Sequence, residues 1–570
     1  MLASGKNRYI HIFFTLTAVF CGLIWAFTNL GYDGEYQVAM SYRMLKGDKM
    51  FLEMWEPHQT SAFLPTALMW LYISLFHTTT GIVLYLQVCG MLIRAGIAYL
   101  LYRTLCGTLD KPLSYGMALL YFMVSPKDYS LPEFSNLQLW YSTLLFCSLC
   151  AYLKKPKPYL LALSALWLCL EVLAYPSCAI VFLGILPVIV IYSAHKWRDV
   201  FIFAGICAGL GLMFLCYFLF TIGPGTFMEC ITGMLALEPT HTVSGISKIW
   251  DYITNLMIIA VVFAVVGIAG AIAALLPHLL LKKKAIRQHK TAWWLLCCAA
   301  VMLAGFFLNI ISAENRSAYG ILLLAIAGAG FLNRNTLDRE EKKVYVCGSV
   351  IGGLGFIATL ILTDHPLITI SVPYGLLAVI ASLMPLRKKA DEISDTAIRK
   401  GLYSCFYCLV ALLAFRCFYI RTPLSGKGQI CSSFSGMAMV RTGPAWGILS
   451  NEEGVCLQRD SYPEWKEWIP PGSKVWVVGS VVDMLGYLYV DVEVAGPSTM
   501  VTPSYNEAVL EYWRLNPDKY PDVIVAEGYL GELSYELLNN RWLMSWLEEE
   551  YRPEYVVEGK YWNYYFRKAP

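Results

Sequence analysis

Residues 9–36 read YIHIFFTLTAVFCGLIWAFTNLGYDGEY, an apolar run that leads into a short acidic segment. The run from Tyr9 to Leu30 has 22 residues. At about 1.5 Å per residue, such a helix crosses the roughly 30 Å of hydrocarbon in a bilayer. Lys6 and Arg8 precede the run, and no small-residue cleavage site follows it. We therefore predict an uncleaved first membrane span with a cytoplasmic N-terminus.

The composition of the whole chain agrees with a membrane protein. Hydrophobic residues make up 57% of the 570 positions and charged residues 15%, against about 25% charged residues in a typical soluble domain. Because so few charges cannot coat several soluble surfaces, the composition excludes a set of soluble domains, a disordered chain and a collagen-like fibre. No basic stretch is long enough, or interleaved with enough aromatic residues, to indicate nucleic-acid binding. We predict a polytopic α-helical membrane protein.

Twelve further apolar runs predict about 13 transmembrane helices in total. These runs lie at about 81–102, 113–125, 137–153, 159–175, 177–193, 200–222, 252–281, 291–311, 318–332, 343–362, 366–385 and 401–420. A further run at 61–76 contains Pro65 and is shorter than an ordinary span. We predict that this short run lies at the membrane interface.

The basic residues indicate on which side each loop lies. If the short run does not cross, 23 Lys and Arg residues fall in cytoplasmic loops and 6 in the opposite loops before residue 421. If it crossed, this bias would invert, against the rule that positive loops stay in the cytoplasm. An odd number of crossings then places the C-terminal part on the extracytoplasmic side.

The chain changes its character near residue 421. Residues 451–570 contain 20 acidic and 10 basic residues, whereas residues 1–450 contain 21 acidic and 34 basic residues. We expect a transmembrane domain over 1–420 and a small extracytoplasmic α/β domain over 421–570. The first extracytoplasmic loop, with interfacial helices, covers 31–80. In the C-terminal domain we expect strands at 474–478, 523–526, 555–557 and 561–566, and helices at 506–515 and 530–547.

Acidic residues gather in the first two predicted extracytoplasmic loops. Asp33 and Glu35 follow the first span directly, and Asp128 and Glu133 lie in the second of these loops. A carboxylate at the membrane face can act as a general base, and carboxylates from two loops can bind a divalent cation. The structural alternatives are that Asp33 caps the helix after it and that the second loop is simply solvated.

Three further polar residues stand out by their positions. His58 is the only histidine of the acidic first loop, Arg94 lies inside an apolar run, and Arg316 lies in a brief extracytoplasmic loop. Because a charge at the centre of a span costs at least about 2.5–3.5 kcal/mol, Arg94 should face the protein interior. Arg94 and Arg316 are candidates to bind a lipid phosphate. The alternatives are an ion pair for Arg94, snorkelling for Arg316 and a structural polar contact for His58.

Two stretches of the first loop carry a family resemblance. Residues 33–48 read DGEYQVAMSYRMLKGD and residues 56–60 read EPHQT. With the interfacial run after them, they resemble the GT-C membrane glycosyltransferases, which include bacterial oligosaccharyltransferase catalytic subunits, protein O-mannosyltransferases and lipid A aminoarabinose transferases. In that family an Asp shortly after the first span begins an external loop with surface-lying helices, and a second acidic loop follows the third span. Thirteen spans before an external C-terminal domain also recur.

The resemblance implies catalytic and binding roles for the residues already singled out. It implies that Asp33 is the catalytic general base and that Glu35 and Glu133 are supporting acids. Together with their positions in the chain, it makes substrate-binding candidates of Arg43, His58, Arg94, Asp128 and Arg316. Asp128 and Glu133 are five positions apart and do not form an acid-x-acid pair. We therefore assign no metal ligands, and a divalent cation, Mg²⁺ or Mn²⁺, is left open.

The resemblance also implies a reaction. A sugar would pass from a polyprenyl-phosphate donor to a hydroxyl of a lipid, glycan or protein acceptor by single displacement, with inversion at the anomeric carbon. The C-terminal domain has no WWD-type signature, which argues against N-linked oligosaccharide transfer. The expected location is the inner membrane of a bacterium.

Two other classes of function stay open at the level of sequence. A transporter or lipid flippase would carry ionisable residues near the membrane midplane, for which Arg94 and Glu171 are the candidates. A receptor-like protein would use the acidic, tryptophan-rich C-terminal domain to bind a partner. No internal repeat supports the transporter.

Overall fold

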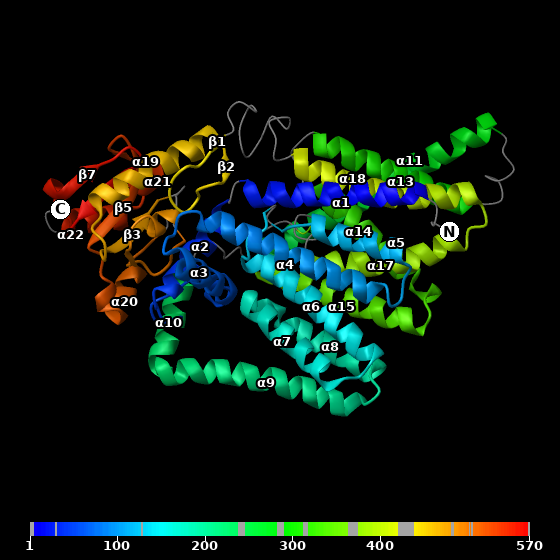
Figure 1. Ribbon diagram of the computed structural model, residues 1–570, viewed down its shortest axis with the longest axis horizontal. Coiled ribbons are helices and arrows are strands. Elements are labelled where there is room, and N and C mark those ends of the chain that lie inside the picture. The colour runs from blue at the N-terminus through cyan, green and yellow to red at the C-terminus, as the bar shows by residue number, and fades with distance from the viewer. Residues whose placement is uncertain are drawn as a thin grey trace.

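The protein is mostly helical and carries a sheet domain at its C-terminal end (Figure 1). The computed structural model describes residues 5–28, 31–126, 129–237, 245–281, 290–311, 317–362, 367, 374–419, 438–479, 484–500, 502 and 505–567. Most helices before residue 420 lie alongside one another in an elongated bundle, and the C-terminal domain packs at one end of it. We call this end of the bundle the domain-proximal end and the other the distal end.

The first half of the bundle contains both predicted loops. Its elements are α1 (Gly5–Phe27), α2 (Tyr32–Leu45), η1 (Gln59–Ser61), α3 (Phe63–Phe76), α4 (Ile82–Leu105), α5 (Lys111–Met123), α6 (Phe134–Lys154), α7 (Pro158–Ala174), η2 (Pro176–Cys178) and α8 (Ala179–Tyr192). The second half consists of α9 (Lys196–Thr221), α10 (Pro224–Leu237), α11 (Gly245–Leu281), α13 (Lys290–Ile311), α14 (Ser317–Leu332), η4 (Arg334–Thr336), α15 (Arg339–Leu362), α17 (Leu376–Asp391) and α18 (Thr396–Tyr419).

Several of these helices indicate a membrane protein. Among the described residues, five helices are long and apolar enough to cross a membrane: Ile82–Leu105, Lys196–Thr221, Ser247–Leu275, Arg339–Ile361 and Thr396–Arg416. Six further apolar helices among the described residues are shorter, with apolar stretches of 10–17 residues. The membrane character is thus supported, and the count of about 13 spans stays a prediction.

The short apolar run of the first loop forms α3. With 14 residues, α3 is about 21 Å long and falls short of the roughly 30 Å of a hydrocarbon core. It turns one apolar stripe outward, in which Phe63 is 41%, Trp70 60% and Leu71 42% exposed. The opposite side, with Met69, is buried against the rest of the protein. A short helix with an outward apolar stripe suits the predicted interfacial position.

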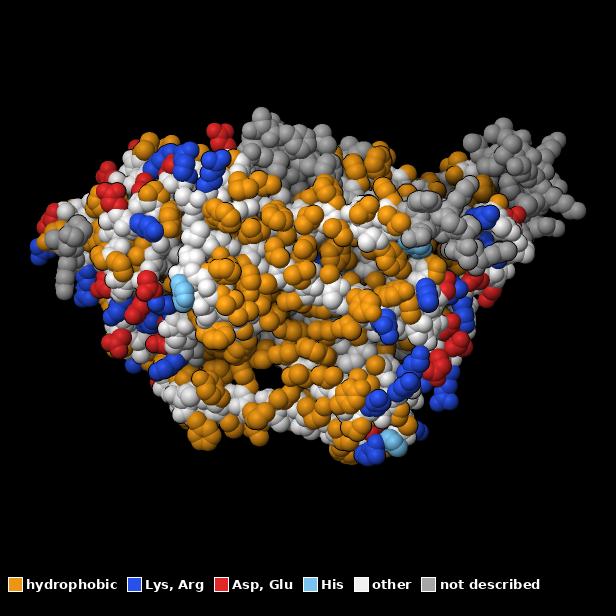
Figure 2. All heavy atoms as spheres, in the orientation of Figure 1, with side chains coloured by type: hydrophobic (Ala, Val, Ile, Leu, Met, Phe, Trp, Pro, Cys, Tyr) orange, Lys and Arg blue, Asp and Glu red, His pale blue; other side chains and the backbone are white. Residues whose placement is uncertain are grey.

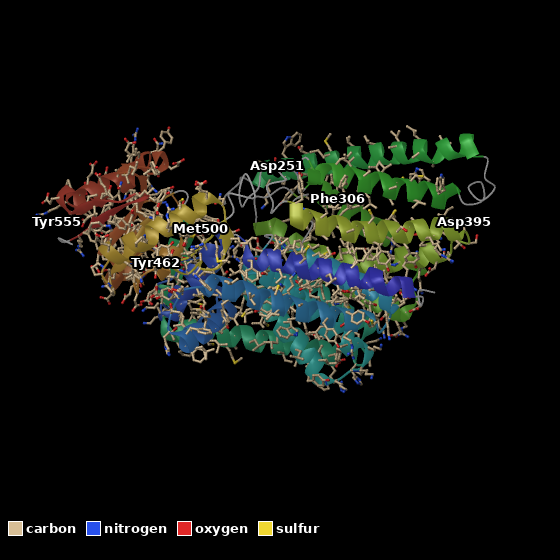
Figure 3. All side chains as sticks on the ribbon, turned by 45° about the horizontal axis from the view of Figure 1, so that its top comes forward. Asp251, Phe306, Asp395, Tyr462, Met500 and Tyr555 are labelled. Carbon is tan, nitrogen blue, oxygen red and sulfur yellow. The ribbon has the colours of Figure 1, made fainter. Side chains whose placement is uncertain are left out.

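Charged side chains lie mainly at the two ends of the molecule. Figure 2 shows hydrophobic side chains over the middle of the visible face, with Lys and Arg, beside Asp and Glu, at its distal end and on the C-terminal domain. Exposed basic residues at the turns after α6 and α8 include Lys154, Lys155, Lys196 and Arg198. Figure 3 shows Asp395, before α18, at the opposite end of the molecule from Tyr555 of the C-terminal domain.

The C-terminal domain is a small mixed sheet with helices. Its elements are β1 (Ala438–Met439), β2 (Leu449–Ser450), α19 (Glu452–Trp468), β3 (Lys474–Val478), η7 (Met484–Leu488), β4 (Glu493–Val494), α20 (Ala508–Leu515), η8 (Pro517–Lys519), β5 (Val523–Tyr529), β6 (Glu532–Leu533), α21 (Tyr535–Leu538), α22 (Arg541–Glu550), η9 (Pro553–Tyr555), β7 (Val556–Glu558) and β8 (Trp562–Phe566). The main sheet has the order β4-β3-β5-β8-β7, in which β3 is parallel to β4 and β5 while β8 is antiparallel to β5 and β7. β1 and β2 form a separate antiparallel pair, and β6 pairs with β5.

Two helices of this domain differ from the sequence expectation. The helix expected at 530–547 is wrong, because Leu530 and Gly531 take positive φ angles of 50° and 91° and turn the chain into a β5–β6 hairpin. Asn540 then starts a new helix, since its side chain accepts a hydrogen bond from the backbone N–H of Leu543 at 3.0 Å. The sequence prediction also missed α19, which contains Pro463.

Candidate active site

Asp33 lies in the first turn of α2, at the domain-proximal end of the bundle. Gly31 precedes the helix with a φ of 68°, a conformation that glycine adopts without strain. Asp33 is therefore not the cap that the structural alternative proposed. It stands one residue inside the helix, where the positive end of the helix dipole favours a negative charge. Its side chain is half-buried.

Glu133 caps α6, the first helix after the second loop. Its carboxylate oxygens accept hydrogen bonds from the backbone N–H groups of Ser135 at 2.8 Å and Asn136 at 2.6 Å. Asn136 in turn donates to the carbonyl of Leu131 at 2.8 Å, so the loop folds back onto the helix start. The whole Glu133 side chain is buried.

The glutamate cap predicts a measurable effect on stability. We expect Glu133→Ala to lower the stability of the protein by about 1 kcal/mol, the usual cost of losing a helix cap, because two buried N–H groups lose their acceptor. The midpoint of thermal unfolding in detergent measures this loss. Glu340→Ala, which removes an exposed acid from the first turn of α15, is the matched control. Equal midpoints for the two variants would contradict the capping role.

Gln37 joins the two loops. Its Oε1 atom accepts hydrogen bonds from the hydroxyl of Ser61 at 2.9 Å and from the backbone N–H of Phe134 at 3.3 Å. Asp33 and Gln37 are four residues apart on α2 and so lie on one face of the helix. Since Phe134 directly follows Glu133, the hydrogen bond holds the beginning of α6 beside the face of α2 that carries Asp33.

Aromatic side chains complete this junction. The ring of His58 stacks on Phe134 with centroids 3.9 Å apart and an angle of 6°, and on Tyr175 at 5.6 Å and 27°. The phenol of Tyr175 interacts electrostatically with the carboxylates of Glu133 and Asp33. His58 therefore packs between Phe134 and Tyr175, and the charges of Glu133 and Asp33 act on the Tyr175 phenol from nearby.

Tyr374, just before α17, joins the same group. Its phenol interacts electrostatically with Tyr175, Glu133 and Asp33, and it hydrogen-bonds to the side chain of Ser135. Sequence reasoning missed Gln37, Tyr175 and Tyr374. The only available signal was a tyrosine at the end of an apolar run, directly before Pro176.

Glu35 lies on a different side of α2 from Asp33. Residues two apart on a helix do not face each other. Burial, together with the charges of Asp33 and Glu35, raises the pKa of Tyr32 to about 12. The negative charges of both carboxylates thus raise the pKa of the first residue of α2. The role of Glu35 as a supporting acid stays a prediction.

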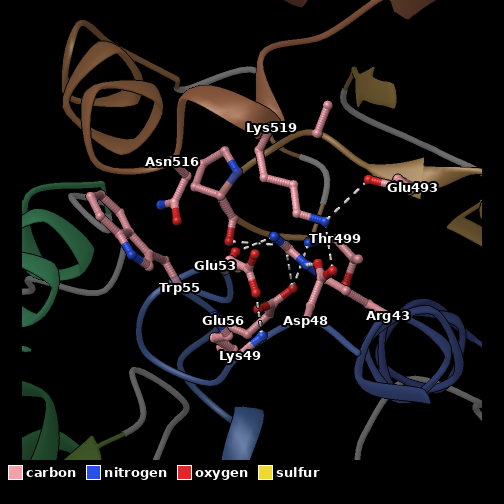
Figure 4. Close-up of polar contacts among 12 residues, drawn as sticks. Arg43, Asp48, Lys49, Glu53, Trp55, Glu56, Glu493, Thr499, Asn516 and Lys519 are labelled. Carbon is pink, nitrogen blue, oxygen red and sulfur yellow. Dashed lines mark hydrogen bonds and ion pairs between the residues drawn. The ribbon is translucent and has the colours of Figure 1, made fainter. Parts of the chain in front are cut away.

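Arg43 comes ten residues after Asp33 in α2, which places it about 15 Å further along the helix axis. It is 1% exposed and fastens the first loop to the C-terminal domain (Figure 4). Its N–H groups bind the side chains of Asp48 (2.5 Å), Glu56 (3.1 Å) and Tyr512 (2.8 Å) and the carbonyl groups of Glu53 and Pro497.

The network around Arg43 holds several charges out of water. Lys519 binds Asp48 at 2.6 Å, and Glu56 accepts a hydrogen bond from the backbone N–H of Thr499 at 3.0 Å. Burial alone would lower the pKa of the Arg43 guanidinium, but Tyr512, Glu56 and Asp48 raise that pKa well above its usual value. Arg43 thus stays charged, and its N–H groups all donate to acceptors of the first loop or of the C-terminal domain.

Of the remaining predicted residues, the structure describes Arg94, which lies in α4. The buried Arg94 guanidinium packs over the rings of Trp25 at 4.8 Å and Tyr121 at 5.9 Å, and donates to the Tyr121 carbonyl at 3.2 Å. Asp128 and Arg316 lie outside the described residues. Within the described residues, no group of three or more His, Cys, Asp or Glu side chains is arranged to hold a metal ion.

Comparisons with known proteins give structural neighbours. No family model matches the sequence, and no curated protein matches it. Among solved structures, the Archaeoglobus fulgidus oligosaccharyltransferase tethered to an acceptor peptide with an NVT sequon is 12% identical at a TM-score of 0.42, covering 91% of this chain and 69% of that one. The archaeal oligosaccharyltransferase AglB from the same organism, with an inhibitory peptide and a dolichol-phosphate, is 12% identical at 0.40, covering 92% and 70%. The A. fulgidus enzyme with zinc and sulfate is 11% identical at 0.43, covering 90% and 68%.

Proposed function

We propose that the protein is a membrane glycosyltransferase that moves a sugar from a polyprenyl-phosphate donor to an acceptor hydroxyl. The observation that carries this proposal is the hydrogen bond from the backbone N–H of Phe134 to Gln37, which joins the helix of Asp33 to the helix start that Glu133 caps. A half-buried carboxylate at the end of a bundle of apolar helices suits a reaction between a lipid-held group and a polar acceptor.

The proposed reaction is a single displacement. Asp33 accepts the proton of the acceptor hydroxyl, whose oxygen attacks the anomeric carbon of the sugar. The bond between that carbon and the phosphate oxygen breaks, and the lipid phosphate leaves with the electron pair, so the configuration inverts. Glu133, held by the start of α6, keeps the second loop in place beside Asp33. The charge of the leaving phosphate is stabilised by basic groups such as Arg316 or Arg94.

The proposed location is the extracytoplasmic face of a bacterial inner membrane. The basic side chains at the distal end of the bundle support a cytoplasmic distal end. The domain-proximal end, with Asp33 and the C-terminal domain, then faces outward. The acceptor is a lipid, glycan or protein that reaches this face, and a divalent cation is a further candidate component.

Reconstitution tests this proposal. Purified protein in liposomes that contain polyprenyl-phosphate sugars and a membrane extract as acceptor should release sugar-free polyprenyl phosphate and form a new glycosidic product. Liposomes without protein are the control. Movement of the donor between leaflets without any covalent product would contradict the proposal and favour a transporter or flippase.

A further inference from the structure

A row of buried polar side chains follows α6 from the candidate active site into the bundle. It consists of Ser135, Gln138 and Ser142, which are three and four residues apart and so share one face of the helix. All three side chains are buried. Ser135 lies next to the start of α6, and Ser142 lies about 10 Å further along the helix axis. We call these three residues the α6 polar stripe.

Glu171 of α7 meets the inner end of the α6 polar stripe. Its Oε1 atom accepts a hydrogen bond from the hydroxyl of Ser142 at 2.5 Å. The thiol of Cys178, a weak donor, lies beside the same carboxyl group. Glu171 takes part in none of the ion pairs formed between described residues. Its partners are therefore a hydroxyl and a thiol, and neither carries a positive charge.

These surroundings favour the protonated form of Glu171. The residue is 0% exposed, and an ionised carboxylate that is buried without a counter-charge has a high free energy. Glu171 also lies in the last turn of α7, where the negative end of the helix dipole opposes a negative charge. A protonated carboxyl group avoids both costs and still offers an acceptor oxygen to Ser142.

The same contacts fix the turn that carries Tyr175. The backbone N–H of Tyr175 donates to the carbonyl of Glu171 at 2.8 Å, and the N–H of Cys178 donates to the carbonyl of Tyr175 at 2.9 Å. Gln138 of the α6 polar stripe donates to the Sγ atom of Cys178 at 3.2 Å and to the hydroxyl of Thr359 in α15 at 3.1 Å. Tyr175 is thus held from both sides, through Glu171 before it and Cys178 after it.

We propose that Glu171, as a neutral acid, is a positioning residue that holds Tyr175 at the candidate active site through the α6 polar stripe. Glu171 acts through the two tyrosines whose phenols interact with the carboxylate of Asp33, namely Tyr175 and Tyr374. Ser135, at the outer end of the stripe, hydrogen-bonds to Tyr374. This inference rests on the proposed function, because the positioned groups surround the proposed base.

Two substitutions of Glu171 in the full-length protein test the neutral acid. Glutamine is uncharged and keeps an acceptor oxygen, so Glu171→Gln should transfer sugar within about twofold of wild type, whereas Glu171→Ala should lose about 10–10²-fold. Liposomes with polyprenyl-phosphate sugars serve for this assay. The infrared difference spectrum between wild type and Glu171→Gln at neutral pH should contain the C=O stretching band of a protonated carboxylic acid.

A pair of serine variants tests the positioning. Ser142→Ala removes the hydrogen bond to Glu171, whereas Ser148→Ala removes a 2.8 Å hydrogen bond to Ser164 between the same two helices, nearer the distal end. Hydrogen exchange followed by mass spectrometry should show faster exchange of the backbone N–H groups at 175–178 in Ser142→Ala and in Glu171→Ala. We expect Ser148→Ala to exchange like wild type there, with similar unfolding midpoints for the two serine variants.

Several results would overturn the inference. An equal loss of transfer in Glu171→Gln and Glu171→Ala, or a difference spectrum with carboxylate bands only, would show that Glu171 does not act as a neutral acid. Equal exchange at 175–178 in the two serine variants would show that the stripe does not hold Tyr175. If wild-type protein transfers no sugar, the proposed function fails, and the infrared and exchange measurements still decide the state of Glu171 and its hold on Tyr175.

Discussion

Asp33→Asn should lower the rate of sugar transfer by about 10²–10⁴-fold, the usual contribution of a positioned general base. The amide has nearly the same size and can still accept hydrogen bonds, but it cannot take a proton from the acceptor hydroxyl at neutral pH. Asp33 is half-buried in the first turn of α2, where an amide of nearly the same size can take the place of the carboxylate. Initial rates of product formation in liposomes, at saturating donor, measure the effect.

The matched control for Asp33 is Asp491→Asn. Asp491 is an exposed acid near the first loop, paired with Lys46 and 66% exposed, and it lies outside the Tyr175 junction. We expect its variant to transfer sugar within about twofold of wild type, since exposed ion pairs contribute little. If both variants kept full activity with unchanged unfolding midpoints, Asp33 would not be the base.

Arg43→Ala should destabilise the protein by about 3–5 kcal/mol, because it leaves the carboxylates of Asp48 and Glu56 without their main counter-charge in a buried place. The side chains of Arg43 and Glu56 are 0% exposed, and that of Asp48 is 7% exposed. The same change frees the first loop from the C-terminal domain. Thermal unfolding in detergent measures the loss, and limited proteolysis should cut the first loop earlier than in wild type.

Lys46→Ala gives the control for this prediction. Lys46 lies three residues after Arg43 and also pairs with the C-terminal domain, but its side chain is 35% exposed. We expect its removal to cost less than about 1 kcal/mol. Arg43→Lys should fall between the two variants, because it restores the charge without the planar set of donors. A loss for Arg43→Ala no larger than for Lys46→Ala would show that the network does not hold the domain.

The sequence was sufficient where one short pattern determines the structure. Apolar runs predicted most helices of the bundle, and short runs of β-branched and aromatic residues predicted the strands at 474–478 and 561–566. It failed where a single residue redirects the chain. Leu530 and Gly531 form a hairpin inside a run that reads as a helix, and Asn540 starts a second helix after it.

The candidate site was predictable only in part, for a similar reason. Asp33 and Glu133 could be named because each lies in an acidic loop after an apolar run. Their meeting depends on the hydrogen bond between Gln37 and the backbone of Phe134, a contact across 97 residues. No local pattern marks such a contact. For the same reason the sequence assigned Arg43 to the substrate, whereas its partners in the structure come from the first loop itself and from the C-terminal domain.

Mass spectrometry of lipids bound to the purified protein tests the central claim most directly. Wild-type protein and the Asp33→Asn variant are isolated from the same membranes and their lipids compared. We predict that the variant holds a polyprenyl phosphate with its sugar still attached, and that wild-type protein holds mainly the sugar-free polyprenyl phosphate. If neither protein carried a polyprenyl lipid, or if both carried the same sugar-free form, Asp33 would not be the base of a lipid-linked sugar transfer.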